Sequence, residues 1–132
     1  MVENLREKAK NYFILGVIAE NLNMNSESAT NYLKSLFAIA DSLILEIKNL
    51  KPKDHAERFN LLKLYFPKIY AITDSTFNTY RRTYTQELNK EELKIVKKRL
   101  IEAFENAKIN IPTNEEIKRR FEEFIKKGKI FS

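Results

Sequence analysis

The sequence has no cysteine, and glycine, proline and histidine occur only 2, 3 and 1 times in 132 residues. Without cysteine the chain has no disulfide framework and no thiol chemistry, which fits a reducing cytoplasm. Sheets with many turns need glycine, whereas helices tolerate neither glycine nor proline well. The composition therefore predicts a single all-α domain with few, short connections and a cytoplasmic location.

A long apolar segment is also missing. The longest uninterrupted apolar run covers residues 12–19, far fewer than the roughly 20 residues that cross a bilayer. The first residues of the chain do not have the composition of a signal peptide. We therefore expect neither a membrane span nor a secretory signal.

The common signatures of catalytic and cofactor sites are absent as well. His55 is the only histidine, so a multi-histidine metal site is excluded, and no Glu-x-x-His motif of the di-iron bundles occurs. There is no glycine-rich phosphate loop and no Gly-x-Ser-x-Gly elbow. We expect no metal, no cofactor and no catalytic residue of these classes. At the start of a helix, His55 is interpreted as a solvated or capping side chain, with a binding role as the alternative.

What the sequence does contain is helical periodicity, which is strongest in residues 26–50. Apolar residues recur there every three or four positions, namely Ala29, Leu33, Leu36, Ala40, Leu43, Ile47 and Leu50. This broad stripe predicts a long helix that packs against several partners. Asn25 or Ser26 is expected to cap it.

Weaker periodicity predicts five further helices, over residues 3–22, 54–66, 67–85, 90 to about 108, and 113–127. Asp54, Asn89 with Glu92, and Thr113 with Glu116 are expected to cap three of them. The predicted fold is an up-and-down four-helix bundle over residues 1–110, with a short connecting helix between the second and the third bundle helix. Residues 111–132 form an extra C-terminal helix and tail of the same domain, whose Ile130 and Phe131 either fold back or dock on a partner.

The net charge of +6 is unevenly distributed along the chain. Residues 1–50 are nearly balanced, and the whole excess of lysine and arginine lies in residues 51–132. Such a basic half is compatible with binding a nucleic acid or another polyanion. Because acidic residues are interleaved with the basic ones, simple solvation of helix surfaces is the alternative.

Two adjacent arginines lie near the end of the helix predicted for residues 67–85. At about 100° per residue, Arg81 falls at the edge of the apolar stripe, near Asp74 and Asn78, while Arg82 points away into solvent. A partly buried arginine binds phosphate or carboxylate with two hydrogen bonds. We therefore expect Arg81 to line a groove or interface, or else to form an ion pair with Asp74.

The order of these segments resembles the small HEPN-domain proteins, which are often paired with minimal nucleotidyltransferases. The resemblance rests on residues 31–37, on residues 51–55 followed by a helix containing Phe59, on residues 80–84, and on residues 89–92, and it covers roughly residues 3–108. It implies a homodimeric bundle, commonly a metal-independent ribonuclease whose arginine is followed after four to six residues by a histidine. Arg81 or Arg82 matches that arginine, and Tyr84 approximates a tyrosine found in some members.

The histidine has no counterpart, because residues 86–89 are Gln, Glu, Leu and Asn. Without it no general acid or base with a pKa near neutrality follows the arginine. We therefore expect a non-catalytic HEPN-like binding module that engages a nucleotide, an RNA or a nucleotidyltransferase partner in a toxin–antitoxin-like system. The candidate binding residues are Arg81, Arg82, Tyr84, Asp74, Asn78 and His55.

Three alternatives remain open at this point. A small basic subunit of a nucleoprotein complex is the first, with a basic surface formed by Lys97, Lys98, Arg99, Arg119 and Arg120 together with further lysines of the C-terminal helix. A structural scaffold without affinity for nucleotides is the second. A metal-independent ribonuclease that uses Arg81, Tyr84 and His55 is the third.

Overall fold

The computed structural model describes residues 1–127, apart from the side chain of Phe124, and these residues form six α-helices and no strand. The helices are α1 (Val2–Asn21), α2 (Asn25–Lys48), α3 (His55–Tyr65), α4 (Pro67–Arg82), α5 (Lys90–Ala107) and α6 (Asn114–Lys126). The prediction of an all-α protein is confirmed for this part of the chain. No helix in it has the length and apolar character needed to span a membrane. The predicted roles of Ile130 and Phe131 lie outside the described residues.

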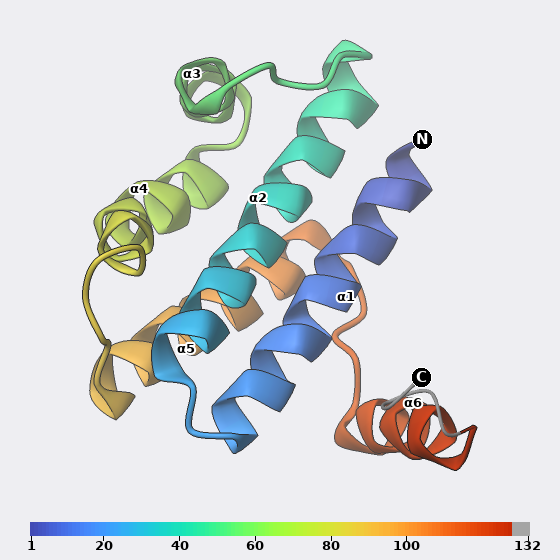
Figure 1. Cartoon of the computed structure of the whole chain (residues 1–132). Coiled ribbons are helices and arrows are strands. Elements are labelled where there is room, and N and C mark those ends of the chain that lie inside the picture. Colours follow the sequence, from blue (N-terminus) through green and yellow to red (C-terminus); the bar gives the residue numbers. More distant parts are fainter. Residues whose placement is uncertain (128–132) are drawn as a thin grey trace.

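The long helix α2 is the centre of the structure, since it contacts α1, α3, α4 and α5. Figure 1 shows α1 and α2 side by side and antiparallel, with α5 behind them and α4 on the other side of α2. Arg82 of α4 pairs with Glu92 of α5, and Ser75 of α4 bonds to Arg99, so α4 and α5 also run antiparallel. Helix α6 lies apart from the other five, near the C-terminal end of α1 (Figure 1).

Helices α1 and α2 approach each other closely at Gly16, where α2 leaves no room for a side chain. The Ser28 hydroxyl donates a hydrogen bond of 2.6 Å to the Gly16 carbonyl, and a Cβ on Gly16 would overlap the ring of Tyr32. The glycine therefore accommodates Tyr32, which is fully buried.

The start of α2 differs from the sequence prediction. Met24 is the N-cap residue and makes no side-chain capping bond. Asn25 donates instead to the Leu88 carbonyl (3.1 Å), while the Ser26 hydroxyl donates to the Gln86 carbonyl (2.9 Å) and accepts from the Leu88 amide (3.0 Å). These polar side chains hold the α4–α5 connection against α2 and so do not cap their own helix.

The other three caps are confirmed. Asp54 accepts a hydrogen bond from the Glu57 amide at the start of α3, and Thr113 accepts from the Glu116 amide at the start of α6. Asn89 and Glu92 form a complete capping box at the start of α5. These signals depend only on residues three positions apart, which explains why the sequence reveals them.

The apolar stripe of α2 is not buried over its whole predicted length. Helix α2 ends at Lys48, and Asn49 has a left-handed backbone conformation with φ of 54°. Ile47 and Leu50 are 55% and 38% exposed. They lie at and beyond the last turn of the helix, where neighbouring helices no longer cover it.

Candidate functional site: an arginine–histidine–aromatic cluster

A buried carboxylate on α2 forms the base of the candidate site. Asp41 is 5% exposed and faces α3 from within a helix whose neighbouring residues are largely apolar. Arg58 of α3 donates to both of its carboxylate oxygens, from Nε to Oδ1 at 2.7 Å and from Nη2 to Oδ2 at 2.9 Å. A paired arrangement of this kind fixes the guanidinium plane as well as its position.

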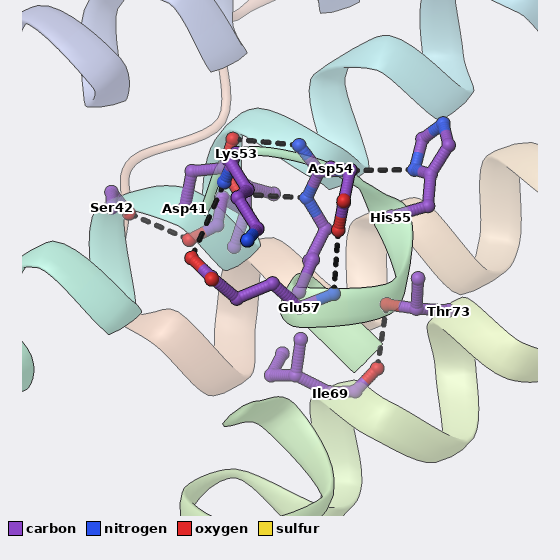
Figure 2. Close-up of polar contacts among 10 residues, drawn as sticks. Asp41, Ser42, Lys53, Asp54, His55, Glu57, Ile69 and Thr73 are labelled. Carbon is purple, nitrogen blue, oxygen red and sulfur yellow. Dashed lines mark hydrogen bonds and ion pairs between the residues drawn. The ribbon is translucent and has the colours of Figure 1, made fainter. Parts of the chain in front are cut away.

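Helix α3 places Arg58 opposite Asp41 because its start is tightly defined. The Asp54 side chain caps the helix, and the Glu57 carboxylate accepts a hydrogen bond from the Lys53 amide (3.3 Å). Figure 2 shows Asp54, His55 and Glu57 grouped at this first turn, with Asp41 facing them. His55 is the first residue of α3 and Arg58 follows one turn later, so both side chains lie on one face.

His55 is bonded to the same arginine. The Nη1 atom of Arg58 lies 2.6 Å from Nδ1 of His55. Because a guanidinium only donates, Nδ1 is assigned as the acceptor and the ring proton is placed on Nε2. Burial, and then the adjacent charge of Arg58, lower the pKa of His55 below its usual value of 6.5. Its surroundings therefore favour the uncharged form of the ring.

Aromatic rings enclose this polar pair. The ring of His55 lies 4.9 Å from Phe37, 5.0 Å from Phe77 and 6.0 Å from Tyr80 between centroids. The guanidinium carbon of Arg58 is 5.0 Å from the centre of the Phe37 ring. Edge-to-face packing of this kind is favourable for aromatic groups and for an arginine beside them.

The row of rings continues from this interior to the surface. Tyr80 and Tyr84 lie edge to face with centroids 5.5 Å apart, and their hydroxyl oxygens are 2.7 Å apart. Burial, followed by the hydrogen bond to Tyr84, raises the pKa of Tyr80 to about 12. Tyr84 itself is 67% exposed. We refer to Phe37, His55, Phe77, Tyr80 and Tyr84 as the aromatic cluster.

The structure brings only part of the predicted site together. His55 and Tyr84 belong to the aromatic cluster. Arg81, Asp74 and Asn78 are exposed, and within residues 1–127 their side chains make no hydrogen bond or ion pair. Neither the predicted groove around Arg81 nor its pairing with Asp74 is seen in this part of the chain.

The prediction that Arg82 points into solvent is wrong. Its Nη1 atom donates to Glu92 at 2.6 Å, and its Nε atom donates to Gln86 at 3.1 Å. The chain reverses direction between α4 and α5, and this reversal places the first turn of α5 against the end of α4. Arg82 thereby holds the two helices together, and its hydrogen bond to Glu92 lowers the pKa of that carboxyl group. A helical wheel of α4 alone contains no information about this neighbour.

The predicted basic residues do not form one continuous surface. Lys97 lines a groove toward α1 and α6, whereas Lys98 and Arg99 line a separate depression toward α4. Arg119 and Arg120 are exposed on α6, and Arg120 donates to Asn11 of α1 at 3.3 Å. A single phosphate backbone would therefore not follow all five side chains.

The sequence analysis missed Asp41 and Arg58. A signal for them existed, because Asp41 stands inside the most apolar helix of the chain and a buried carboxylate requires a cationic or hydrogen-bonding partner. Identification of that partner needs the position of α3, which periodicity does not give.

The cluster offers limited chemistry for catalysis. Nδ1 of His55 is bonded to Arg58, so Nε2 is the nitrogen at which the ring can exchange a proton with a ligand. Within the described residues, no three histidine, aspartate or glutamate side chains are grouped closely enough to hold a metal ion. What the cluster does provide is a set of flat rings, one of them highly exposed, with an arginine beside them.

Comparisons of the chain with protein-family models, with curated protein sequences and with solved structures find no match.

Proposed function

We propose that this chain is a non-catalytic, HEPN-like helical module that binds single-stranded RNA, with the aromatic cluster as the stacking site. The observation that carries the proposal is the row of rings from His55 through Phe77 and Tyr80 to the exposed Tyr84. An exposed tyrosine held by a second tyrosine is a ready platform for an unpaired base.

The energetics favour such a role. Stacking of one base on an aromatic side chain contributes about 1–3 kcal/mol, and it tolerates any base because every base has a π face. Arg81 precedes Tyr84 by three positions and is exposed, so it is available to a phosphate next to the stacked base. The net charge of +6 adds a general attraction for RNA.

The HEPN-like part of the proposal is supported by the helix order. Helices α1 and α2 form one antiparallel pair and α4 and α5 form another, with α3 as a short connection and α6 as an addition. We include in the proposal the homodimer and the nucleotidyltransferase partner that the resemblance implies. Leu15 of α1 is 50% exposed and is one apolar residue available for such a contact.

The absence of an arginine–histidine pair at Arg81 supports a binding rather than a catalytic role. His55 is the one histidine, and its contact is with Arg58, which is itself held by Asp41. An arginine fixed in this way supports the fold and is not available to a scissile phosphate.

The experiment compares a fluorescently labelled single strand of RNA with the duplex of the same length in anisotropy titrations. Stacking needs unpaired bases, so we expect the single strand to bind at least tenfold more tightly than the duplex. Binding of both should weaken as the salt concentration rises. Equal affinity for the two forms, or no binding at low salt, would contradict the proposal. Sedimentation velocity of the purified chain tests the homodimer separately.

A further inference from the structure

A groove of about 830 Å³ lies on another part of the molecule, between the last turn of α1, the first half of α5, and α6. None of the residues of the aromatic cluster lines it. Its apolar lining comes from these three helices and from the residue that follows α1, and consists of Val17, Ile18, Leu22, Leu93, Ile117 and Phe121. Two large apolar side chains of this lining are well exposed, Leu22 at 63% and Phe121 at 42%.

The polar lining of the groove carries a strong excess of positive charge. Lys90, Lys94 and Lys97 follow one face of α5, and Lys118 lies on α6. Among the described residues that line the groove, Glu20 is the one acidic side chain. It already accepts hydrogen bonds from the Tyr32 hydroxyl (2.6 Å) and from the Lys97 amine (3.2 Å).

Within the part of the chain that the structure describes, the amines of Lys90, Lys94 and Lys118 are therefore left without a counter-charge among the lining residues of the groove. Lys94 is 3.9 Å from Glu91, but both side chains are largely exposed, at 74% and 82%, so this pair is weak. A lysine side chain can lay its methylene groups along an apolar wall and extend its amine to the rim. The result is an apolar interior beneath a rim of positive charge.

We infer that this groove binds a small amphipathic anion, namely a fatty acid whose acyl chain lies along the apolar lining and whose carboxylate meets the lysine amines. The volume of the groove lies within the range of about 300–1,000 Å³ that is usual for small-molecule sites. The charge pattern selects an anion, and the apolar lining selects a ligand with a hydrocarbon body over a bare phosphate.

Helix α6 is expected to respond to this ligand. Ile117 is the one buried residue among the described side chains of α6, so the helix is only slightly attached to the rest of the chain. A ligand that contacts Phe121 and Lys118 on one side and Leu93 on the other adds apolar contact between α6 and α5. Bound ligand should therefore slow amide hydrogen exchange in α6.

The test uses isothermal titration calorimetry with dodecanoate below its micelle concentration, and two comparison probes. Dodecyltrimethylammonium has the same chain with a positive head, and inorganic phosphate has the negative charge without a chain. We expect dodecanoate to bind at least tenfold more tightly than either comparison probe. Binding of the cationic probe with equal affinity would overturn the inference, and so would the absence of dodecanoate binding.

The matched variants reverse charge inside and outside the groove. The double variant Lys94→Glu/Lys118→Glu should weaken dodecanoate binding at least tenfold, whereas Lys98→Glu, on the same helix but outside the groove, should leave it unchanged. Thermal melting establishes that each variant is folded, and Lys94→Glu alone replaces the double variant if the latter melts early. Equal loss in the Lys98 variant, or no loss in the groove variant, would contradict the inference.

Discussion

Arg58 binds both carboxylate oxygens of Asp41, at 2.7 and 2.9 Å, although the two residues are 17 positions apart and belong to different helices. The side chains are only 12% and 6% exposed. The pair therefore fixes α3 against α2, and through the third hydrogen bond of Arg58 it also fixes the ring of His55. The position of His55 in the aromatic cluster therefore depends on this contact.

The first prediction concerns the stability that this pair provides. Arg58→Met leaves the Asp41 carboxylate buried without a partner and should lower the free energy of unfolding by about 3–5 kcal/mol. Urea denaturation followed by circular dichroism measures the change. The control Arg6→Met removes the exposed contacts to Glu3 and Glu46 and should cost at most about 1 kcal/mol.

The double variant Arg58→Met/Asp41→Leu tests which of two effects destabilises Arg58→Met: the unpaired charge on Asp41 or the loss of packing around residue 58. Replacing both ions with apolar side chains should restore much of the lost stability, because no buried charge then lacks a partner. A double variant as unstable as Arg58→Met would show that the charge on Asp41 is not the cause.

The second prediction is a dependence of stability on pH that belongs to His55. The pKa of His55 in the folded chain lies below 6.5. As the pH falls through this region, the unfolded chain therefore binds more protons than the folded chain does. The contribution of uncharged His55 to the free energy of unfolding is present above pH 6.5 and is lost toward lower pH. The charges of Asp41 and Asp54 partly oppose the lowering of its pKa. The His55→Gln variant should lose less stability than the wild type between about pH 7.5 and about pH 5.5. Parallel curves for the two proteins would contradict the assignment.

The third prediction concerns the crossing of α1 and α2. Gly16→Ala introduces a Cβ that overlaps the buried ring of Tyr32, and overpacking of this kind costs about 1–3 kcal/mol. The gain in helix propensity, about 1 kcal/mol, offsets part of this cost. Thermal melting should therefore show a lower midpoint for Gly16→Ala. Asn4→Ala, at an exposed position of the same helix, should leave the midpoint unchanged or raise it.

The sequence predicts the helices well because their signals are local. Periodicity locates all six, and the caps at Asp54, Asn89 and Thr113 need only the residues of one turn. The capping prediction fails at Asn25 and Ser26, because their side chains bond to a connection about 60 residues away.

The candidate site was harder to predict because it is assembled from three helices. His55 and Tyr84 could be chosen from their types and positions, but Arg58 and Asp41 acquire their roles only when α3 lies against α2. Arg82 was placed in solvent for the same reason, since its partner Glu92 belongs to the next helix. Side-chain orientation within one helix does not determine which neighbour covers it.

The central claim, that the aromatic cluster stacks unpaired bases, is tested most directly by removing its most exposed ring. The measurement is the affinity of a labelled single-stranded RNA for Tyr84→Ala and for the control Tyr65→Ala, which removes an exposed tyrosine of α3 outside the cluster. Loss of one stacked base, about 1–3 kcal/mol, predicts a reduction in affinity of roughly 5- to 150-fold for Tyr84→Ala only. Equal affinities for the wild type and both variants would contradict the account.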